Sequence, residues 1–174
     1  MNKILLVIDM QNDFVTGALG TAEAQAIVPA IKNKIAAANE SGNTKIVFTR
    51  DTHTHNYLST MEGQYLPVEH CIKGTPGWCI IEELYHTDYD TIDKPTFGYA
   101  GDWSEAFKYS QIDEIEIVGV CTDICVITNS LILKTLYPNT HIVVDASCCA
   151  GVTPEKHAAA LEVMKSCQID VIGE

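Results

Sequence analysis

Short apolar runs alternate along this chain with stretches of helical periodicity, and this alternation most constrains the fold. The run Lys3 to Asp9 is continuously apolar up to its last residue, as in a parallel strand covered on both faces. Further strands are predicted at Lys45–Thr49, Thr91–Lys94, Ile115–Val118, His141–Asp145 and Ile169–Ile172. Helices are predicted at Glu23–Ser41, Trp78–Tyr85, Asp102–Tyr109, Asp123–Leu136 and Pro154–Ser166. This order predicts a three-layer α/β/α fold with a doubly wound six-stranded parallel sheet, in a single domain of residues 1–174.

Charge and hydropathy exclude several classes of partner. The net charge is −12, with 11 basic and 23 acidic residues, whereas nucleic-acid binding needs a positive surface. No apolar run is long enough to span a membrane, and the N-terminus leads directly into a strand instead of a signal peptide. We therefore expect a cytoplasmic protein with no nucleic-acid or membrane partner.

The cysteines fit a reducing compartment. Seven cysteines are an odd number, and several lie in apolar stretches, so free thiols are expected. The adjacent pair Cys148-Cys149 allows two interpretations. It could be a redox or soft-metal site, but small buried hydrophobic residues near a strand end are the favoured one.

The stretch from Ile115 to Val126 combines a strand, a break at Gly119 and the start of a helix. Thr122 or Asp123 is suited to cap that helix through a side-chain oxygen. Cys125 then lies in the first turn, where free amides and the helix dipole favour thiolate over thiol. The sequence predicts a reactive cysteine at the carboxyl end of a central strand.

Ligands of open parallel sheets bind beyond the carboxyl ends of the strands, and Asp9, Lys94 and Cys125 all lie at such ends. We therefore expect these three side chains to converge on one crevice. Asp9 could accept the thiol proton and return it to a leaving amine, while Lys94 keeps Asp9 ionised and favours the thiolate. Backbone amides in the turn before Cys125 could bind an oxyanion. Because the first strand leads to no glycine-rich phosphate motif, a dinucleotide is disfavoured.

Five motifs resemble the isochorismatase-like cysteine hydrolase superfamily, and within it the nicotinamidase-related amidases. They are Asp9 followed by Gln11, Asp13 and Phe14; Thr49-Arg-Asp-Thr-His53; His70-Cys-Ile-Lys-Gly-Thr-Pro-Gly77; Lys94-Pro-Thr-Phe97; and Gly119-Val-Cys-Thr-Asp-Ile-Cys-Val126. The resemblance implies a catalytic triad of Asp9, Lys94 and Cys125. It also implies a cis peptide between Val120 and Cys121, an oxyanion hole from the amides of Cys121 and Cys125, and a thioester formed with loss of ammonia.

The long polar segment after Arg50 carries candidate metal ligands. An Asp-x-His pattern places Asp51 and His53 on one side of an extended segment. The resemblance extends the set to His70, with Glu62 fitting as the fourth ligand better than His55, although both stay open. Such a set accepts zinc first, with iron or manganese as alternatives, and would polarise a pyridine nitrogen.

The predicted activity is a metal-dependent amidohydrolase that converts a small pyridine carboxamide such as nicotinamide to its acid and ammonia. Phe14 and Phe97, beside catalytic positions, are the predicted ring contacts. The segment Lys94-Pro-Thr-Phe-Gly-Tyr99 departs from the Lys-x-x-Tyr-Ser-Ala-Phe common in nicotinamidases, which leaves the substrate open. Alternatives are an amidase for another carboxamide or carbamoyl compound, and a non-catalytic metal- or thiol-sensing protein; an isochorismate-type vinyl ether hydrolase needs no thiol and is disfavoured.

The predicted assembly is a homo-oligomer, as the resemblance implies. Apolar side chains on the helix after Cys125 exceed what one buried face needs. They are Val126, Ile127, Leu131 and Ile132.

Overall fold

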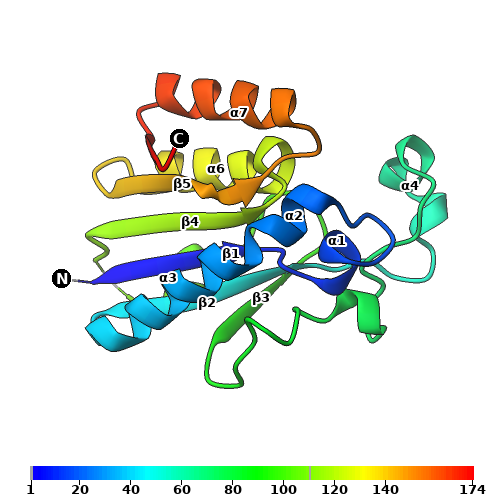
Figure 1. Ribbon diagram of the computed structural model, residues 1–174, viewed down its shortest axis with the longest axis horizontal. Helices are drawn as coiled ribbons and strands as arrows, with labels where there is room; N and C mark the ends of the chain where they lie inside the picture. The colour runs from blue at the N-terminus through cyan, green and yellow to red at the C-terminus, as the bar shows by residue number, and fades with distance from the viewer. Residues whose placement is uncertain (1, 110) are drawn as a thin grey trace.

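Six parallel strands form one sheet in the order β3-β2-β1-β4-β5-β6 (Figure 1). The computed structural model describes residues 2–109 and 111–174. The strands are β1 (Lys3–Ile8), β2 (Thr44–Asp51), β3 (Asp90–Lys94), β4 (Glu114–Val120), β5 (His141–Ala150) and β6 (Asp170–Ile172). The chain order reverses between β1 and β4, which is where ligands of doubly wound sheets bind. The predicted fold is therefore confirmed.

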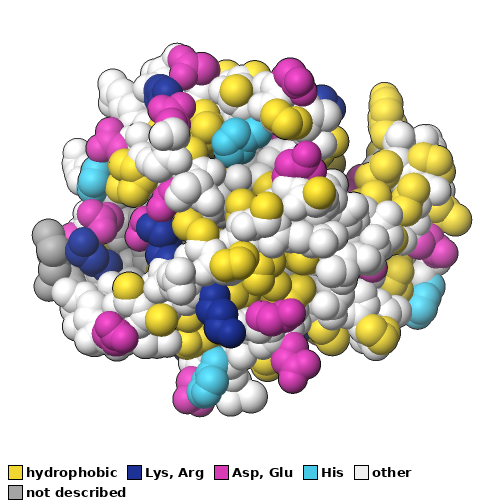
Figure 2. Space-filling model, in the orientation of Figure 1, with side chains coloured by type: hydrophobic (Ala, Val, Ile, Leu, Met, Phe, Trp, Pro, Cys, Tyr) yellow, Lys and Arg dark blue, Asp and Glu magenta, His cyan; other side chains and the backbone are white. Residues whose placement is uncertain are grey.

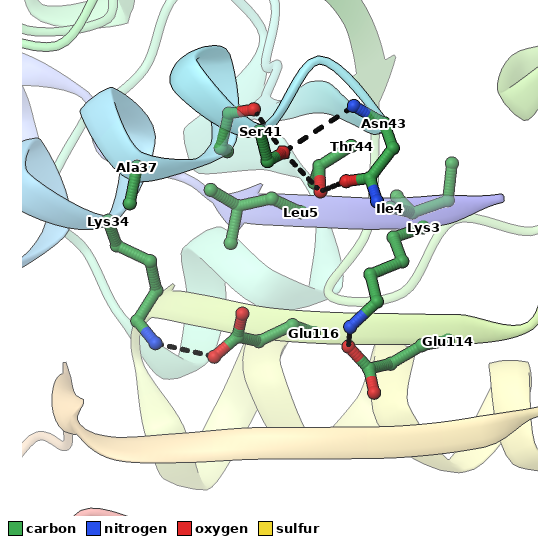
Figure 3. A pocket seen from close by; sticks show the side chains of 11 residues that line it. Lys3, Ile4, Leu5, Lys34, Ala37, Ser41, Asn43, Thr44, Glu114 and Glu116 are labelled. Atoms are coloured by element: carbon green, nitrogen blue, oxygen red, sulfur yellow. Dashed lines mark hydrogen bonds and ion pairs between the residues drawn. The ribbon is translucent and has the colours of Figure 1, made fainter. Parts of the chain in front are cut away.

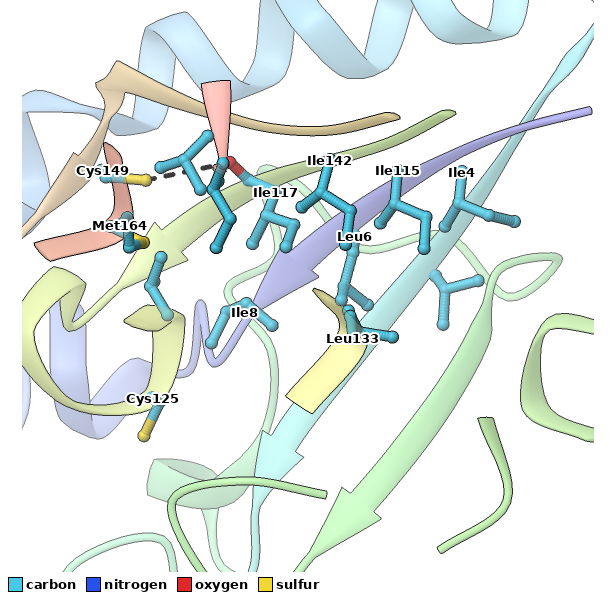
Figure 4. Close-up of a cluster of buried hydrophobic side chains, with 14 of the residues drawn as sticks. Ile4, Leu6, Ile8, Ile115, Ile117, Cys125, Leu133, Ile142, Cys149 and Met164 are labelled. Atoms are coloured by element: carbon cyan, nitrogen blue, oxygen red, sulfur yellow. Dashed lines mark hydrogen bonds between the residues drawn. The ribbon is translucent and has the colours of Figure 1, made fainter. Parts of the chain in front are cut away.

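Helices cover both faces of this sheet. One face carries α1 (Asn12–Val15), α2 (Ala22–Ala26) and α3 (Val28–Ser41); the other carries α5 (Trp103–Phe107), α6 (Ile127–Leu136) and α7 (Pro154–Ser166). Side chains of β1 alternate between the two layers: Ile4, Leu6 and Ile8 face α5–α7, as Figure 4 shows, whereas Leu5 and Val7 face α1–α3. The two apolar layers hold the strand ends in fixed positions.

Two predicted helices differ from the structure. The stretch Glu23–Ser41 is divided at Ile27 into α2 and α3, because Pro29 lacks an N–H and its ring excludes an uninterrupted helix. The stretch Trp78–Tyr85 is not a helix. It begins with the short 3-10 turn η2 (Pro76–Trp78), and Ile80 then forms a bridge with Gln11 in extended backbone.

The adjacent cysteines of β5 lie on opposite faces of the sheet. Cys148 belongs to the apolar layer under α1–α3, and Cys149 to the layer under α5–α7. Successive side chains of a strand point in opposite directions, so the two thiols cannot share a metal ion. Both are free and buried, which favours their interpretation as small core residues.

The predicted break of the strand at Gly119 is wrong: β4 continues through Gly119 to Val120, and only its register with β5 shifts there. Gly119 instead allows a close backbone approach between β4 and β1. Gly119 has φ +119°, and a Cβ there would lie 2.1 Å from the carbonyl oxygen of Ile8. We expect Gly119→Ala to lower the free energy of unfolding by about 3 kcal/mol, through a disfavoured φ and displacement of β1. Gly42→Ala is the matched control, because Gly42 also has positive φ but open space around it, and about 1 kcal/mol is expected. Equal losses in urea unfolding would contradict this account.

A hollow of about 390 Å³ lies near the amino ends of the central strands β1 and β4 (Figure 3). Its charged groups neutralise one another. Lys3 Nζ lies 2.7 Å from Glu114 Oε1, and Lys34 Nζ lies 2.5 Å from Glu116 Oε1. Ion pairs therefore occupy this hollow. The predicted catalytic residues lie at the opposite, carboxyl ends of the strands.

The surface carries acidic groups over many elements (Figure 2). A projecting arm with the 3-10 turn η1 (Tyr57–Ser59) and α4 (Met61–Tyr65) extends beyond the carboxyl ends of the strands (Figure 1). Its outer side exposes Leu58, Met61 and Tyr65. Among the helices of residues 2–109 and 111–174, none is both long and apolar enough to cross a membrane.

Candidate active site

The side chains of Asp9, Lys94 and Cys125 meet at the carboxyl ends of β1, β3 and β4. Lys94 Nζ lies 2.6 Å from Asp9 Oδ2 and 3.5 Å from Cys125 Sγ. Both Asp9 and Lys94 are fully buried. The convergence predicted from the strand ends is therefore observed, and a thiol, a carboxylate and an ammonium form one contact group.

Neighbouring groups fix the orientation of this group. Thr49 on β2 donates its hydroxyl to Asp9 Oδ1 at 2.6 Å, and Lys94 donates to the carbonyl oxygen of Thr96 at 3.2 Å. Asp9 itself has φ +50°, so the chain turns sharply at the end of β1. Each polar group is held from more than one side.

Burial controls the proton distribution. It raises the pKa of the Asp9 carboxyl, which Lys94 opposes. Burial alone would lower the pKa of Lys94, but the charges of Asp9, Cys125 and Asp51 outweigh it and raise that pKa. Lys94 therefore stays protonated, and Asp9 is a stronger base than an exposed aspartate.

Burial opposes the helix-end effect that was expected to favour a thiolate at Cys125. Burial and the negative charge of Asp9 raise the pKa of the Cys125 thiol well above its ordinary value, despite the opposing effect of Lys94. The sulfur lies at one end of an aliphatic cluster and points away from it (Figure 4). A base must remove the thiol proton before the sulfur can react.

The turn that carries Cys125 differs in detail from the predicted helix start. A π-helical turn, η3 (Thr122–Val126), precedes α6, and neither Thr122 nor Asp123 caps it. Thr122 instead contacts His157 Nδ1 at 2.8 Å, and Asp123 accepts from the amide of Val152 at 2.9 Å. Contacts with α7 and with the segment between β5 and α7 therefore hold η3 in place. The peptide bond between Val120 and Cys121 is cis, as the resemblance implies.

Four candidate metal ligands cluster beside the thiol group. Ligand atoms of Asp51, His53, Glu62 and His70 all lie within 4.8 Å of one another. His53 Nε2 lies 2.8 Å from Asp51 Oδ2, and His70 Nε2 lies 3.5 Å from the same oxygen. His55 is exposed and outside the cluster. The structure therefore groups Glu62, not His55, with the other three.

The set fits a divalent cation chemically. Asp51 Oδ1 is buried and, among the described residues, has no hydrogen-bond partner. His70 Nδ1 lies 2.8 Å from the carbonyl oxygen of Val68, which leaves Nε2 free as a ligand. Two imidazoles and two carboxylates form a mixed nitrogen and oxygen donor set suited to zinc, iron or manganese.

Gln11 and Asp13 position the metal ligands, a role that the sequence alone did not reveal. The Gln11 side chain pairs with the backbone of Asp51, donating to its carbonyl oxygen at 2.9 Å and accepting from its amide at 2.7 Å. Asp13 accepts from the amide of Cys71 at 2.8 Å, beside His70. The segment after β1, including α1, thus contacts the backbone at Asp51 and the backbone next to His70.

One cavity of about 320 Å³ joins the thiol and the ligand cluster. Cys121 and Cys125 line it together with Asp51, Glu62 and His70. The other lining residues are mostly apolar: Phe14, Leu19, Thr21, Leu66, Phe97, Ile124, Val152 and Lys156. Such a wall suits a flat ring with few polar groups, and both predicted ring contacts, Phe14 and Phe97, belong to it.

Asn129 is a further residue that the sequence reading missed. It is fully buried on α6 and donates to the carbonyl oxygens of Cys125 at 2.7 Å and Phe97 at 3.1 Å. Its Oδ1 accepts from the amide of Tyr99 at 2.8 Å. Asn129 thereby ties the segment after Lys94 to the nucleophile turn. Its signal was a polar residue four positions after Cys125, one helical turn away on the same side of the helix.

Comparison with known proteins places this arrangement in a family. The isochorismatase domain family matches residues 3–173. The chain belongs to the isochorismatase family. A solved pyrazinamidase of Pyrococcus horikoshii in complex with zinc resembles this isochorismatase-family protein with a TM-score of 0.86 and 30% identity over 100% of both chains.

Curated relatives of this isochorismatase-family protein include enzymes and one protein described as inactive. A nicotinamidase/pyrazinamidase of Mycobacterium tuberculosis is 26% identical over 98% of each chain. A protein of Arabidopsis thaliana described as a probable inactive nicotinamidase is 31% identical, covering 95% of this chain and 89% of its own. The curated relatives therefore differ in whether they are described as active. The residues at the active site must be considered for each protein.

Proposed function

We propose that this protein hydrolyses a small pyridine carboxamide such as nicotinamide to the acid and ammonia, with a divalent metal ion and a thioester on Cys125. The chain is an amide-hydrolysing enzyme of the isochorismatase family. One observation supports the proposed substrate, metal ion and thioester. The contact group of Asp9, Lys94 and Cys125 shares a cavity with the four-ligand cluster.

Proton transfer begins with Asp9. Its carboxylate takes the Cys125 proton as the sulfur attacks the carbonyl carbon, and Lys94 stabilises the negative charge that passes between them. Amides of Cys121 and Cys125, which border the cavity, bind the oxyanion. Asp9 then returns the proton to the leaving nitrogen, and ammonia departs as the thioester forms. Water activated by Asp9 hydrolyses the thioester and restores the thiol.

Asp51, His53, Glu62 and His70 would hold the metal ion, zinc in the first instance. When bound, the ion supplies a Lewis acid that anchors the pyridine nitrogen. Phe14 and Phe97 line the cavity and contact the faces of the ring.

The fourth-ligand assignment has a direct test. We expect Glu62→Ala to weaken zinc binding by more than about tenfold, the lower limit for loss of even an outer-shell partner. His55→Ala should leave zinc affinity within about twofold, because His55 lies outside the cluster. Competition titration with a zinc-sensitive chelator measures both variants. A larger effect from His55→Ala than from Glu62→Ala would reverse the assignment.

The sequence also allowed a non-catalytic binding protein, and one relative is described as a probable inactive nicotinamidase. The burial of Asp9 and Lys94 disfavours it, because two buried charges beside a thiol cost stability that a simple binding pocket does not require. An amidase for another carboxamide or carbamoyl compound is the alternative within enzymes.

The cellular setting follows the same proposal. All seven cysteines are free, which fits a reducing, cytoplasmic compartment.

A homo-oligomer is supported by an apolar hollow of about 500 Å³ beside α6, with Leu131, Ile132 and Leu136 among its lining residues. Val126 is fully buried and does not contribute to that surface.

Ammonia release separates these functions. Zinc-loaded protein with a free Cys125 thiol is expected to release ammonia from nicotinamide and to lose this activity after chelation, with recovery on adding zinc, iron or manganese. Absence of ammonia from nicotinamide would reject the pyridine substrate. Release from aliphatic or carbamoyl amides only would favour the second amidase function.

A further inference from the structure

Lys156 is the one lining residue of the substrate cavity whose role the proposed reaction leaves unexplained. It comes from the first turn of α7 and lies at the cavity beside Val152 and Ile124. Apart from Lys94 in the buried contact group, it is the only cation at this end of the described sheet that borders the cavity. Lys156 is an exposed residue at the border of a cavity whose other lining residues include two carboxylates and no second lysine or arginine.

The position of Lys156 is not explained by helix stability. A cation in the first turn is disfavoured by the helix dipole. At the other end of α7, Lys165 pairs with Glu162 at 2.8 Å and Glu174 at 2.7 Å. No acid of the described chain lies within ion-pairing distance of Lys156, although the protein carries a net charge of −12. An unpaired ammonium at a cavity mouth is available to an anion brought by a ligand.

Sheet order places Lys156 across the cavity from the metal-ligand cluster. The cluster follows β2, Cys125 follows β4, and α7 follows β5. Because β2 and β5 lie on either side of the β1–β4 pair, the cluster and Lys156 approach the nucleophile from opposite sides. A ring with its carboxamide at Cys125 and one edge at the cluster would turn another edge toward Lys156.

We propose that Lys156 makes this enzyme selective for carboxamides that carry an anionic group on the ring edge remote from the metal-ligand cluster. This assignment rests on the proposed amidase function and narrows its substrate class to carboxylated aromatic carboxamides. The protein's net charge of −12 would otherwise disfavour the entry of an anionic substrate, and a cation at the cavity border opposes this repulsion.

A matched pair of substrates tests this selectivity. Zinc-loaded enzyme is assayed for ammonia release from 5-carbamoylpyridine-3-carboxylate and from its neutral methyl ester. The ratio of kcat/KM for the acid over the ester is expected to fall about fivefold in Lys156→Met, as for loss of one partly exposed ion pair, and further in Lys156→Glu. Added salt should lower the ratio in wild type and not in Lys156→Met. Lys32→Met, an exposed lysine outside the cavity, should leave the ratio unchanged.

A binding measurement separates this inference from the amidase proposal. Pyridine-3,5-dicarboxylate is titrated by calorimetry into zinc-loaded Cys125→Ala protein, with and without Lys156→Glu. Weaker binding in the double variant supports the role of Lys156 even if no carboxamide is hydrolysed, in which case only the amidase proposal fails. Hydrolysis with a ratio within twofold of wild type in both Lys156 variants overturns the inference and leaves the amidase proposal standing.

Discussion

Replacing Cys125 with alanine is expected to reduce ammonia release from nicotinamide by at least about 1,000-fold, because Cys125 carries the sulfur that lies against Lys94 and forms the thioester. The fold should survive, since the change removes one buried sulfur at the edge of a core cluster, at a cost of about 1 kcal/mol in the free energy of unfolding. Ammonia assays and urea unfolding of the same preparation measure the two quantities.

Cys149→Ala is the matched control for that variant. Cys149 is buried in the same apolar layer as Cys125 but lies on β5, outside the cavity lining. It should show a similar loss of stability with activity retained. If Cys125→Ala kept more than a few per cent of wild-type turnover, covalent catalysis by this thiol would be wrong.

Replacing Lys94 with methionine should affect both stability and activity. The ammonium is fully buried and lies 2.6 Å from Asp9 Oδ2, so its loss leaves a buried carboxylate without a cationic partner. Breaking such a pair typically costs about 3–5 kcal/mol, here measured as the free energy of unfolding in urea. Turnover should fall by at least about 100-fold, because Asp9 would then hold its proton and could not take one from Cys125.

The double variant Lys94→Met/Asp9→Asn distinguishes the two effects. Removing both charges should restore much of the lost stability, since the buried carboxylate of Asp9 is removed together with its cationic partner. Activity should stay absent because no base remains beside Cys125. Recovery of activity along with stability would show that the pair serves folding alone.

The positions of the strands in the sequence predicted most of the fold and the location of the active site. The strands predicted to end at Asp9 and Lys94, and the strand predicted before Cys125, were sufficient to place three side chains at one crevice, because parallel strands share a carboxyl edge. The division of Glu23–Ser41 was also readable from Pro29, whose ring excludes a continuous helix.

The remaining features depend on contacts between distant segments. The pairing of Gln11 with Asp51 joins residues 40 positions apart, and no local pattern encodes it. The raised pKa of the Cys125 thiol depends on complete burial, whose effect is opposite to the helix-end effect that the sequence suggests. Lys156 reaches the cavity only because α7 packs beside η3, so its proximity to Cys125 required the folded structure.

Hydroxylamine partitioning tests the thioester on Cys125 most directly. Zinc-loaded enzyme is incubated with nicotinamide and increasing hydroxylamine, and nicotinic acid, its hydroxamate and ammonia are quantified together. The account predicts that hydroxamate replaces acid as hydroxylamine rises, because the amine intercepts the acyl-enzyme, and that Cys125→Ala forms neither product. Ammonia and nicotinic acid released with no hydroxamate at any hydroxylamine concentration would contradict a covalent intermediate on this thiol.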